Sequence, residues 1–170
     1  MKRHLRFCVP GILLAALLTG CVVQSFYPFY TDNSKVAMPQ LAGEWDLIKS
    51  SGEEVSNKNI KPWVFTGDEI LAMNENHATG QIQTVYFKVG TQVYCDSIAG
   101  EPKGEINEYW YFHHRPLHTV SKVDIKDDVL TFRLLDYEWF KKALDSKQIN
   151  LPFLTPAEKD SIPLLTASPE

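Results

Sequence analysis

The chain has 170 residues, with 17 Lys and Arg against 21 Asp and Glu, which gives a formal net charge of −4 at pH 7. An acidic balance without a clustered basic stripe argues against nucleic acid as a partner, because phosphate recognition depends on gathered Lys and Arg. The length suits one domain with a sizeable core.

The first 20 residues have the pattern of an export signal. Lys2, Arg3 and Arg6 give a basic start, and the apolar run 9–18 follows. This run is too short for the roughly 20 apolar residues of a membrane-spanning helix, but it suits the apolar region of a signal peptide. Removal of residues 1–20 would leave 14 basic and 21 acidic residues, a net charge of −7.

A tetrad of lipoprotein type ends this signal, namely Leu18-Thr19-Gly20-Cys21. It resembles the lipobox of bacterial lipoproteins, which implies cleavage between Gly20 and Cys21 and lipid, including palmitate, on Cys21. A thiol is needed because its thiolate is a good nucleophile, and several acyl chains anchor a protein stably where one does not. Val22 then implies the outer membrane, with the domain facing the periplasm. The alternative is an ordinary secretory signal with a chance cysteine.

Residues 22–40 connect this anchor to a domain expected at 41–170. The stretch 25–31 contains four aromatic side chains and is too aromatic for a plain flexible tether. Its rings either pack on the domain or lie at the lipid headgroups, as amphipathic rings do. We favour packing on the domain, because residues 31–34 turn the chain toward the first strand.

From Leu41 onward the sequence predicts strand after strand. Apolar and small residues alternate with acids over 41–47, and this period of two residues is typical of a half-buried strand. Further strands are expected at 61–66, 69–74, 81–89, 92–98, 106–114, 118–125 and 129–135. Short turns separate them, including Asp127-Asp128. The fold class is therefore all-β, an antiparallel meander of about eight strands that closes into a barrel and so removes exposed edges.

One or two short helices are expected near the C-terminus. Asp136 can cap a helix over 137–144, and 155–158 resembles a second helix start. Four side chains would form the apolar face of the first helix: Trp139, Phe140, Ala143 and Leu144.

Cys95 is the one cysteine left after Cys8 leaves with the signal and Cys21 takes lipid. The mature domain therefore cannot form an internal disulfide. We expect Cys95 to be buried among strands as a small hydrophobic residue; the alternative is a reactive or intermolecular thiol.

Gly43-Glu44-Trp45 on the first strand, together with eight strands and a following helix, resembles the lipocalin arrangement. In lipocalins the glycine lets the chain bend into the barrel and the tryptophan closes one end. An arginine from the last strand packs across that tryptophan, which implies this role for Arg133. The chain departs from lipocalins because it lacks their Thr-Asp-Tyr loop motif and a disulfide.

The closer resemblance is to a group of poorly characterised bacterial lipoproteins with a small lipocalin-like domain. The matching stretches are 27–31, 41–45, 115–119 and 135–142, which span most of the mature chain. This resemblance implies location and fold but no established activity.

The histidines are the strongest candidates for a metal-binding or catalytic site. His114 and His118 would share a strand face, whereas His113 would point to the other face, and Pro116 interrupts the strand. No acid or cysteine near in sequence completes a metal site, so we predict no metal, no cofactor and no catalytic residues. Without a G-x-S-x-G elbow, an H-E-x-x-H helix or a phosphate-binding glycine loop, a metal-dependent hydrolase is the least favoured function.

The aromatic run 109–112 allows two interpretations of the barrel interior. Tyr109 and Tyr111 share one strand face, where they either fill the barrel or line a cavity with their hydroxyls available to a ligand. We favour packing. The expected function is a binding or accessory role at the membrane surface, for a small apolar ligand or an envelope protein. The alternative is a structural or assembly lipoprotein with a filled barrel.

Overall fold

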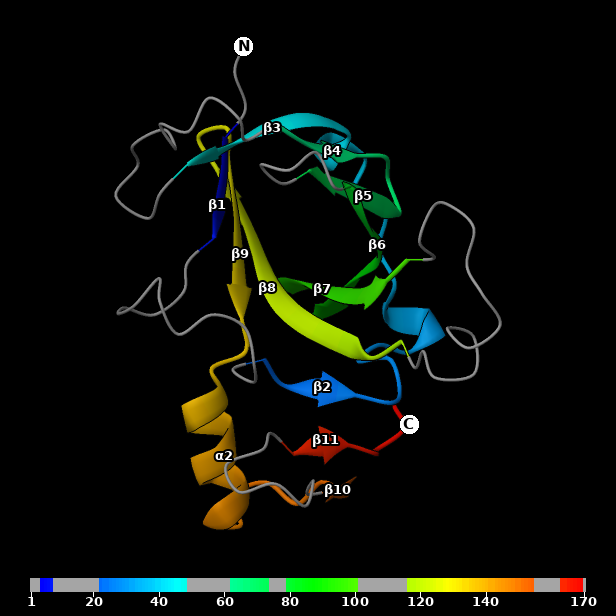
Figure 1. Cartoon of the computed structure of the whole chain (residues 1–170). Helices are drawn as coiled ribbons and strands as arrows, with labels where there is room; N and C mark the ends of the chain where they lie inside the picture. The colour runs from blue at the N-terminus through cyan, green and yellow to red at the C-terminus, as the bar shows by residue number, and fades with distance from the viewer. Residues whose placement is uncertain are drawn as a thin grey trace.

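A closed β-barrel dominates the computed structural model, which describes residues 4–7, 22–48, 62–73, 79–100, 116–154 and 163–169. Consecutive strands from β3 to β9 pair antiparallel (Figure 1). The predicted all-β meander that closes into a barrel is confirmed. In the described residues the barrel strands are β1 (His4–Phe7), β3 (Gly43–Ile48), β4 (Trp63–Phe65), β5 (Glu69–Met73), β6 (Thr79–Val89), β7 (Gln92–Ala99), β8 (His118–Lys126) and β9 (Val129–Leu134).

Strand β1 closes the barrel, and it comes from the segment that the sequence predicts to be an export signal. The seven meander strands leave β3 and β9 running in the same direction, and β1 lies between them, parallel to both (Figure 1). Leu5 is level with Leu47 of β3 and Leu130 of β9. The strand expected at 106–114 lies outside the described residues.

The hairpin turns follow the local sequence signals. Asp127 and Asp128 join β8 to β9 with φ of 51° and 60°, the left-handed conformation that a two-residue hairpin of the primed type requires. Gly90 has φ of 60° in the β6–β7 turn. Turn chemistry therefore sets the register of both hairpins.

Side chains on the inner faces of the strands form the main core. Trp45 is 2% exposed, donates its Nε1 hydrogen to the carbonyl oxygen of Leu41 at 2.7 Å, and meets Phe65 edge-on. Gly43 has φ of 124°, a conformation that glycine adopts without strain and that suits the bend implied by the lipocalin resemblance. The core comprises Leu5, Leu41, Trp45, Phe65, Ile70, Tyr86, Cys95, Val123, Leu130 and Phe132.

Arg133 does not take the place implied by that resemblance. Leu130 and Phe132 face the core, so the alternation of β9 puts Arg133 on the outer surface. Its Nη1 lies 2.6 Å from Oδ2 of Asp124 on the neighbouring strand. The expectation that Arg133 packs across Trp45 is therefore wrong, because Trp45 lies on the inner side of the barrel wall.

A short helix, α2 (Tyr137–Asp145), follows the barrel. The carboxylate of Asp136 accepts the backbone N–H of Trp139 at 2.9 Å, which confirms the predicted cap. Phe140, Ala143 and Leu144 are buried as expected, whereas Trp139 is 55% exposed and does not belong to the buried face. The second helix start at 155–158 lies outside the described residues. In the part of the chain described, no helix is long and apolar enough to span a membrane.

Three very short strands form an annex beside the barrel. These are β2 (Gln24–Ser25), β10 (Phe153–Leu154) and β11 (Leu164–Leu165), which extend the sheet from β8 and lie near α2 (Figure 1). A second, smaller core joins the annex to the helix. Its buried residues are Val23, Phe140, Leu144 and Leu165.

We predict that Trp45→Ala lowers the free energy of unfolding by about 3–5 kcal/mol, because it empties a large volume in the core. Trp139→Ala is the matched control and should change it by less than about 0.5 kcal/mol, since that ring is mostly exposed. Urea unfolding followed by far-ultraviolet circular dichroism measures both. Equal losses in the two variants would contradict this description of the core.

Candidate functional site

The segment that follows Cys21 is built into the fold. Strand β2 pairs antiparallel with the first residues of β8. Strand β9 ends its pairing with β8 at Leu134, so this part of the β8 edge is available to β2. On its other side β2 pairs parallel with β11. Val22 forms a further bridge to Asp136 at the start of α2. Backbone hydrogen bonds therefore hold this segment on both sides.

Val23 places this segment in a hydrophobic core. Its side chain is 1% exposed and packs with Phe140, Leu144 and Leu165 of the second core. Since only one residue separates Val23 from Cys21, the predicted lipid-bearing position adjoins a packed structure.

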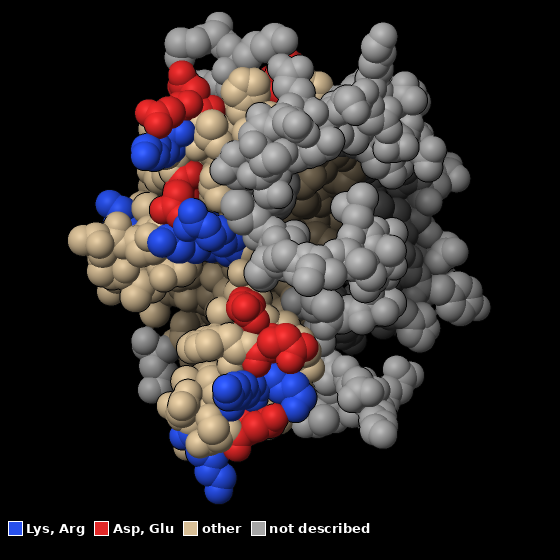
Figure 2. Space-filling model, turned by 90° about the vertical axis from the view of Figure 1, so that its left-hand side faces the viewer, with Lys and Arg blue, Asp and Glu red and all other residues tan. Residues whose placement is uncertain are grey.

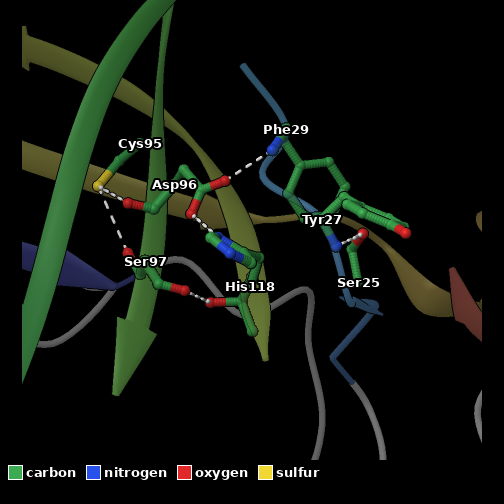
Figure 3. A network of polar contacts seen from close by, with 8 residues as sticks. Ser25, Tyr27, Phe29, Cys95, Asp96, Ser97 and His118 are labelled. Carbon is green, nitrogen blue, oxygen red and sulfur yellow. Dashed lines mark hydrogen bonds and ion pairs between the residues drawn. The ribbon is translucent and has the colours of Figure 1, made fainter. Parts of the chain in front are cut away.

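Asp96 fastens the next part of the segment to the barrel (Figure 3). This aspartate lies on β7 and is 2% exposed. One carboxylate oxygen accepts the backbone N–H of Phe29 at 2.7 Å, and the other lies 2.7 Å from Nδ1 of His118 on β8. A single buried carboxyl group therefore joins β7, β8 and the segment after Cys21, and we call Asp96, His118 and Phe29 the clasp.

Burial explains why the clasp needs both contacts. Removing a carboxylate from water is costly unless hydrogen bonds replace the lost hydration. The Phe29 amide and the His118 ring supply a partner to each oxygen of Asp96. Loss of either partner would leave a buried oxygen without a hydrogen bond, which ties the position of the segment to the stability of the fold.

The aromatic side chains of this segment divide into two groups. Phe29 packs against the second core, and the ring of Tyr30 lies 6.2 Å from that of Phe87. Phe26 and Tyr27 are 42% and 47% exposed. Packing on the domain is therefore confirmed for one pair of rings, while the other pair stays accessible to the surroundings.

The predicted turn after the aromatic residues is confirmed as a short 3-10 helix, η1 (Asp32–Ser34). The Ser34 hydroxyl accepts the Thr31 N–H at 3.1 Å and donates to the Thr31 carbonyl at 2.8 Å. The amide of Val36 then donates to the Tyr86 carbonyl oxygen at 2.8 Å. These contacts guide the chain along the barrel through η2 (Pro39–Leu41) into β3.

The clasp orients an imidazole, and the neighbouring thiol of Cys95 does not serve it as a nucleophile. Cys95 precedes Asp96 on β7, so its side chain points to the opposite face and is 0% exposed. Burial raises the pKa of the Cys95 thiol to about 12, which keeps it protonated and unreactive at neutral pH. The expectation that Cys95 is a buried small hydrophobic residue is confirmed.

Several candidate residues lie outside the described part of the chain. They are Gly20, Cys21, Tyr109, Tyr111, His113 and His114. His118 is described, and its Nδ1 contacts Asp96. Within the described ranges, no three His, Cys, Asp or Glu residues are placed to hold a metal ion. Asp96 is a functional residue that the sequence motifs did not single out, and the available signal is a charged residue in the middle of a strand.

Comparison with known proteins gives no family assignment: no protein-family model matches this chain, and no similar curated protein or solved structure was found.

We predict that Asp96→Ala lowers the free energy of unfolding by about 3 kcal/mol, because it removes both contacts of a buried carboxyl group. The Phe29 amide should also exchange with solvent at least about tenfold faster. Asp124→Ala is the matched control, since it removes an exposed ion pair with Arg133 and should cost less than about 1 kcal/mol. Urea unfolding and hydrogen exchange measure these effects. An unchanged Phe29 exchange rate in Asp96→Ala would show that the clasp does not hold the segment.

Proposed function

We propose that this protein is a bacterial lipoprotein, anchored through Cys21 to the outer membrane and facing the periplasm, whose barrel presents a surface to an envelope protein partner. The observation that carries the proposal is the burial of Val23 two positions after Cys21. A plain tether would leave this position in solvent, whereas a core residue so near the anchor sets the distance between membrane and domain.

The reach of the chain supports a domain in contact with the membrane surface. Two residue steps from Cys21 to Val23 span at most about 7 Å. Phe26 and Tyr27 are exposed a few residues further on, and so are Phe153 and Leu154 of the same annex sheet. Aromatic and apolar side chains of this kind suit the level of the lipid headgroups.

Surface charge supports lipid, rather than electrostatic attraction, as the source of membrane binding. Basic and acidic side chains are interspersed over the face that carries α2 and the β8–β9 hairpin (Figure 2). Lys141 and Asp145 form one ion pair on this face, and Arg133 and Asp124 form another. Anionic lipids attract a gathered polybasic patch, and the described charges on this face are mixed instead, which supports the lipid anchor as the source of the affinity.

Packing inside the barrel favours a protein partner over a small apolar ligand. Ligand-binding barrels keep an open interior. In the described part of this barrel, Trp45, Phe65 and Phe132 are almost fully buried against one another. A ligand would compete with these side chains for the same space, whereas a partner protein can bind without displacing them.

We predict that Cys21→Ser abolishes processing and lipid attachment, because serine lacks the sulfur that receives the diacylglyceryl group. The variant should keep the mass of the unprocessed chain and incorporate no labelled palmitate. Cys8→Ser, which changes a signal cysteine outside the lipobox tetrad, is the control and should be processed normally. Intact mass spectrometry and palmitate labelling provide the readout. A Cys21→Ser protein that is still cleaved and lipidated would refute the proposal.

A further inference from the structure

The proposed processing conflicts with the closed barrel at one strand. The pairing of β1 runs from His4 beside Val129 to Phe7 beside Phe132, and His4 to Arg6 also pair with β3. Leu5 is 0% exposed within the main core. Yet β1 belongs to residues 1–20, which the lipoprotein route removes. The processed chain therefore lacks the strand that lies between β3 and β9.

Removing β1 leaves a gap one strand wide, which we call the seam. Adjacent strands lie about 4.8 Å apart, so β3 and β9, which now flank β1, would be separated by about twice that distance. Both edges would present unpaired backbone N–H and C=O groups. Leu47 and Leu130, which are level with Leu5, would lose their apolar neighbour. An open edge of this kind is a template for another strand.

The side chain of His4 shows that β1 does not satisfy every polar group at its position between β3 and β9. The backbone N–H of His4 donates to the Asp128 carbonyl oxygen at 3.0 Å, which fixes where the strand starts. Its Nδ1 is buried and has no hydrogen-bond partner in the described structure. A buried nitrogen without a partner is unfavourable, so a different side chain at this level would fit better.

We propose that in the processed protein the seam binds an extended segment of a partner protein, which runs parallel to β3 and β9 and places an apolar side chain where Leu5 lies. This inference rests on the proposed function, because the seam opens only if residues 1–20 are removed. The occupant is a polypeptide because two facing strand edges need donors and acceptors at the spacing of a peptide backbone. Its inward side chain has to be apolar, since Leu5 contacts the main core.

The test uses the processed protein, purified in detergent from cells that make the full chain. Its intact mass first shows whether residues 1–20 are gone, which tests the proposed function separately. Hydrogen exchange of β3 and β9 is then compared with and without a synthetic peptide of residues 2–9 carrying Cys8→Ser. The matched control is the same peptide with Leu5→Asp, and amides of the β6–β7 hairpin serve as the internal reference.

We expect the β3 and β9 amides that face the seam to exchange rapidly in the processed protein and at least about tenfold more slowly with the peptide. The control peptide should have no effect. If the barrel needs its eighth strand to fold, the β6–β7 amides will also be unprotected until the peptide is added, which equally supports the proposal.

Two results would overturn the seam proposal while leaving the lipoprotein assignment intact. The first is protection of the β3 and β9 amides in the processed protein before any peptide is added, because the seam would then be closed by the protein itself. The second is exchange that the Leu5-containing peptide does not slow. A purified protein that retains residues 1–20 would instead refute the proposed function, and the seam proposal with it.

Discussion

The buried carboxyl group of Asp96 is the contact on which the arrangement of this protein depends. It lies on β7, orients His118 on β8, and holds the backbone of Phe29. Strand β2 spans only two residues, so it is too short to fix the segment after Cys21 by itself. The clasp and the burial of Val23 add the missing constraints. Together they turn a stretch that would otherwise be a tether into part of the folded domain.

Sequence patterns predicted the features that depend on near neighbours. Alternation located β6 and β7, the Asp127-Asp128 pair located a hairpin, and Asp136 located the start of α2. The clasp was not predictable in this way, because Asp96 meets Phe29 and His118 across separations of 67 and 22 residues. Only the assembled sheet brings these residues together. Helical periodicity also predicted wrongly that Trp139 belongs to the buried face of α2. The second core covers a narrower face of this helix than the apolar pattern suggests.

Residues 4–7 are the clearest case in which one segment supports two different descriptions. Their basic and apolar composition is typical of an export signal, although polar and apolar residues alternate over these four positions as in a short strand. The structure nevertheless pairs them with β3 and β9 and buries Leu5. We propose that the two descriptions apply before and after processing. The precursor closes its barrel with β1, and the processed protein binds a segment of its partner in place of that strand.

The chain after Cys21 is part of the folded domain and not a tether. Backbone ¹⁵N relaxation of residues 22–30 in the processed protein tests it most directly. If the clasp and the second core hold this segment, its order parameters should be about 0.85, equal to those of β7. Values below about 0.6 in this segment beside a rigid β7 would describe a flexible tether and contradict the account.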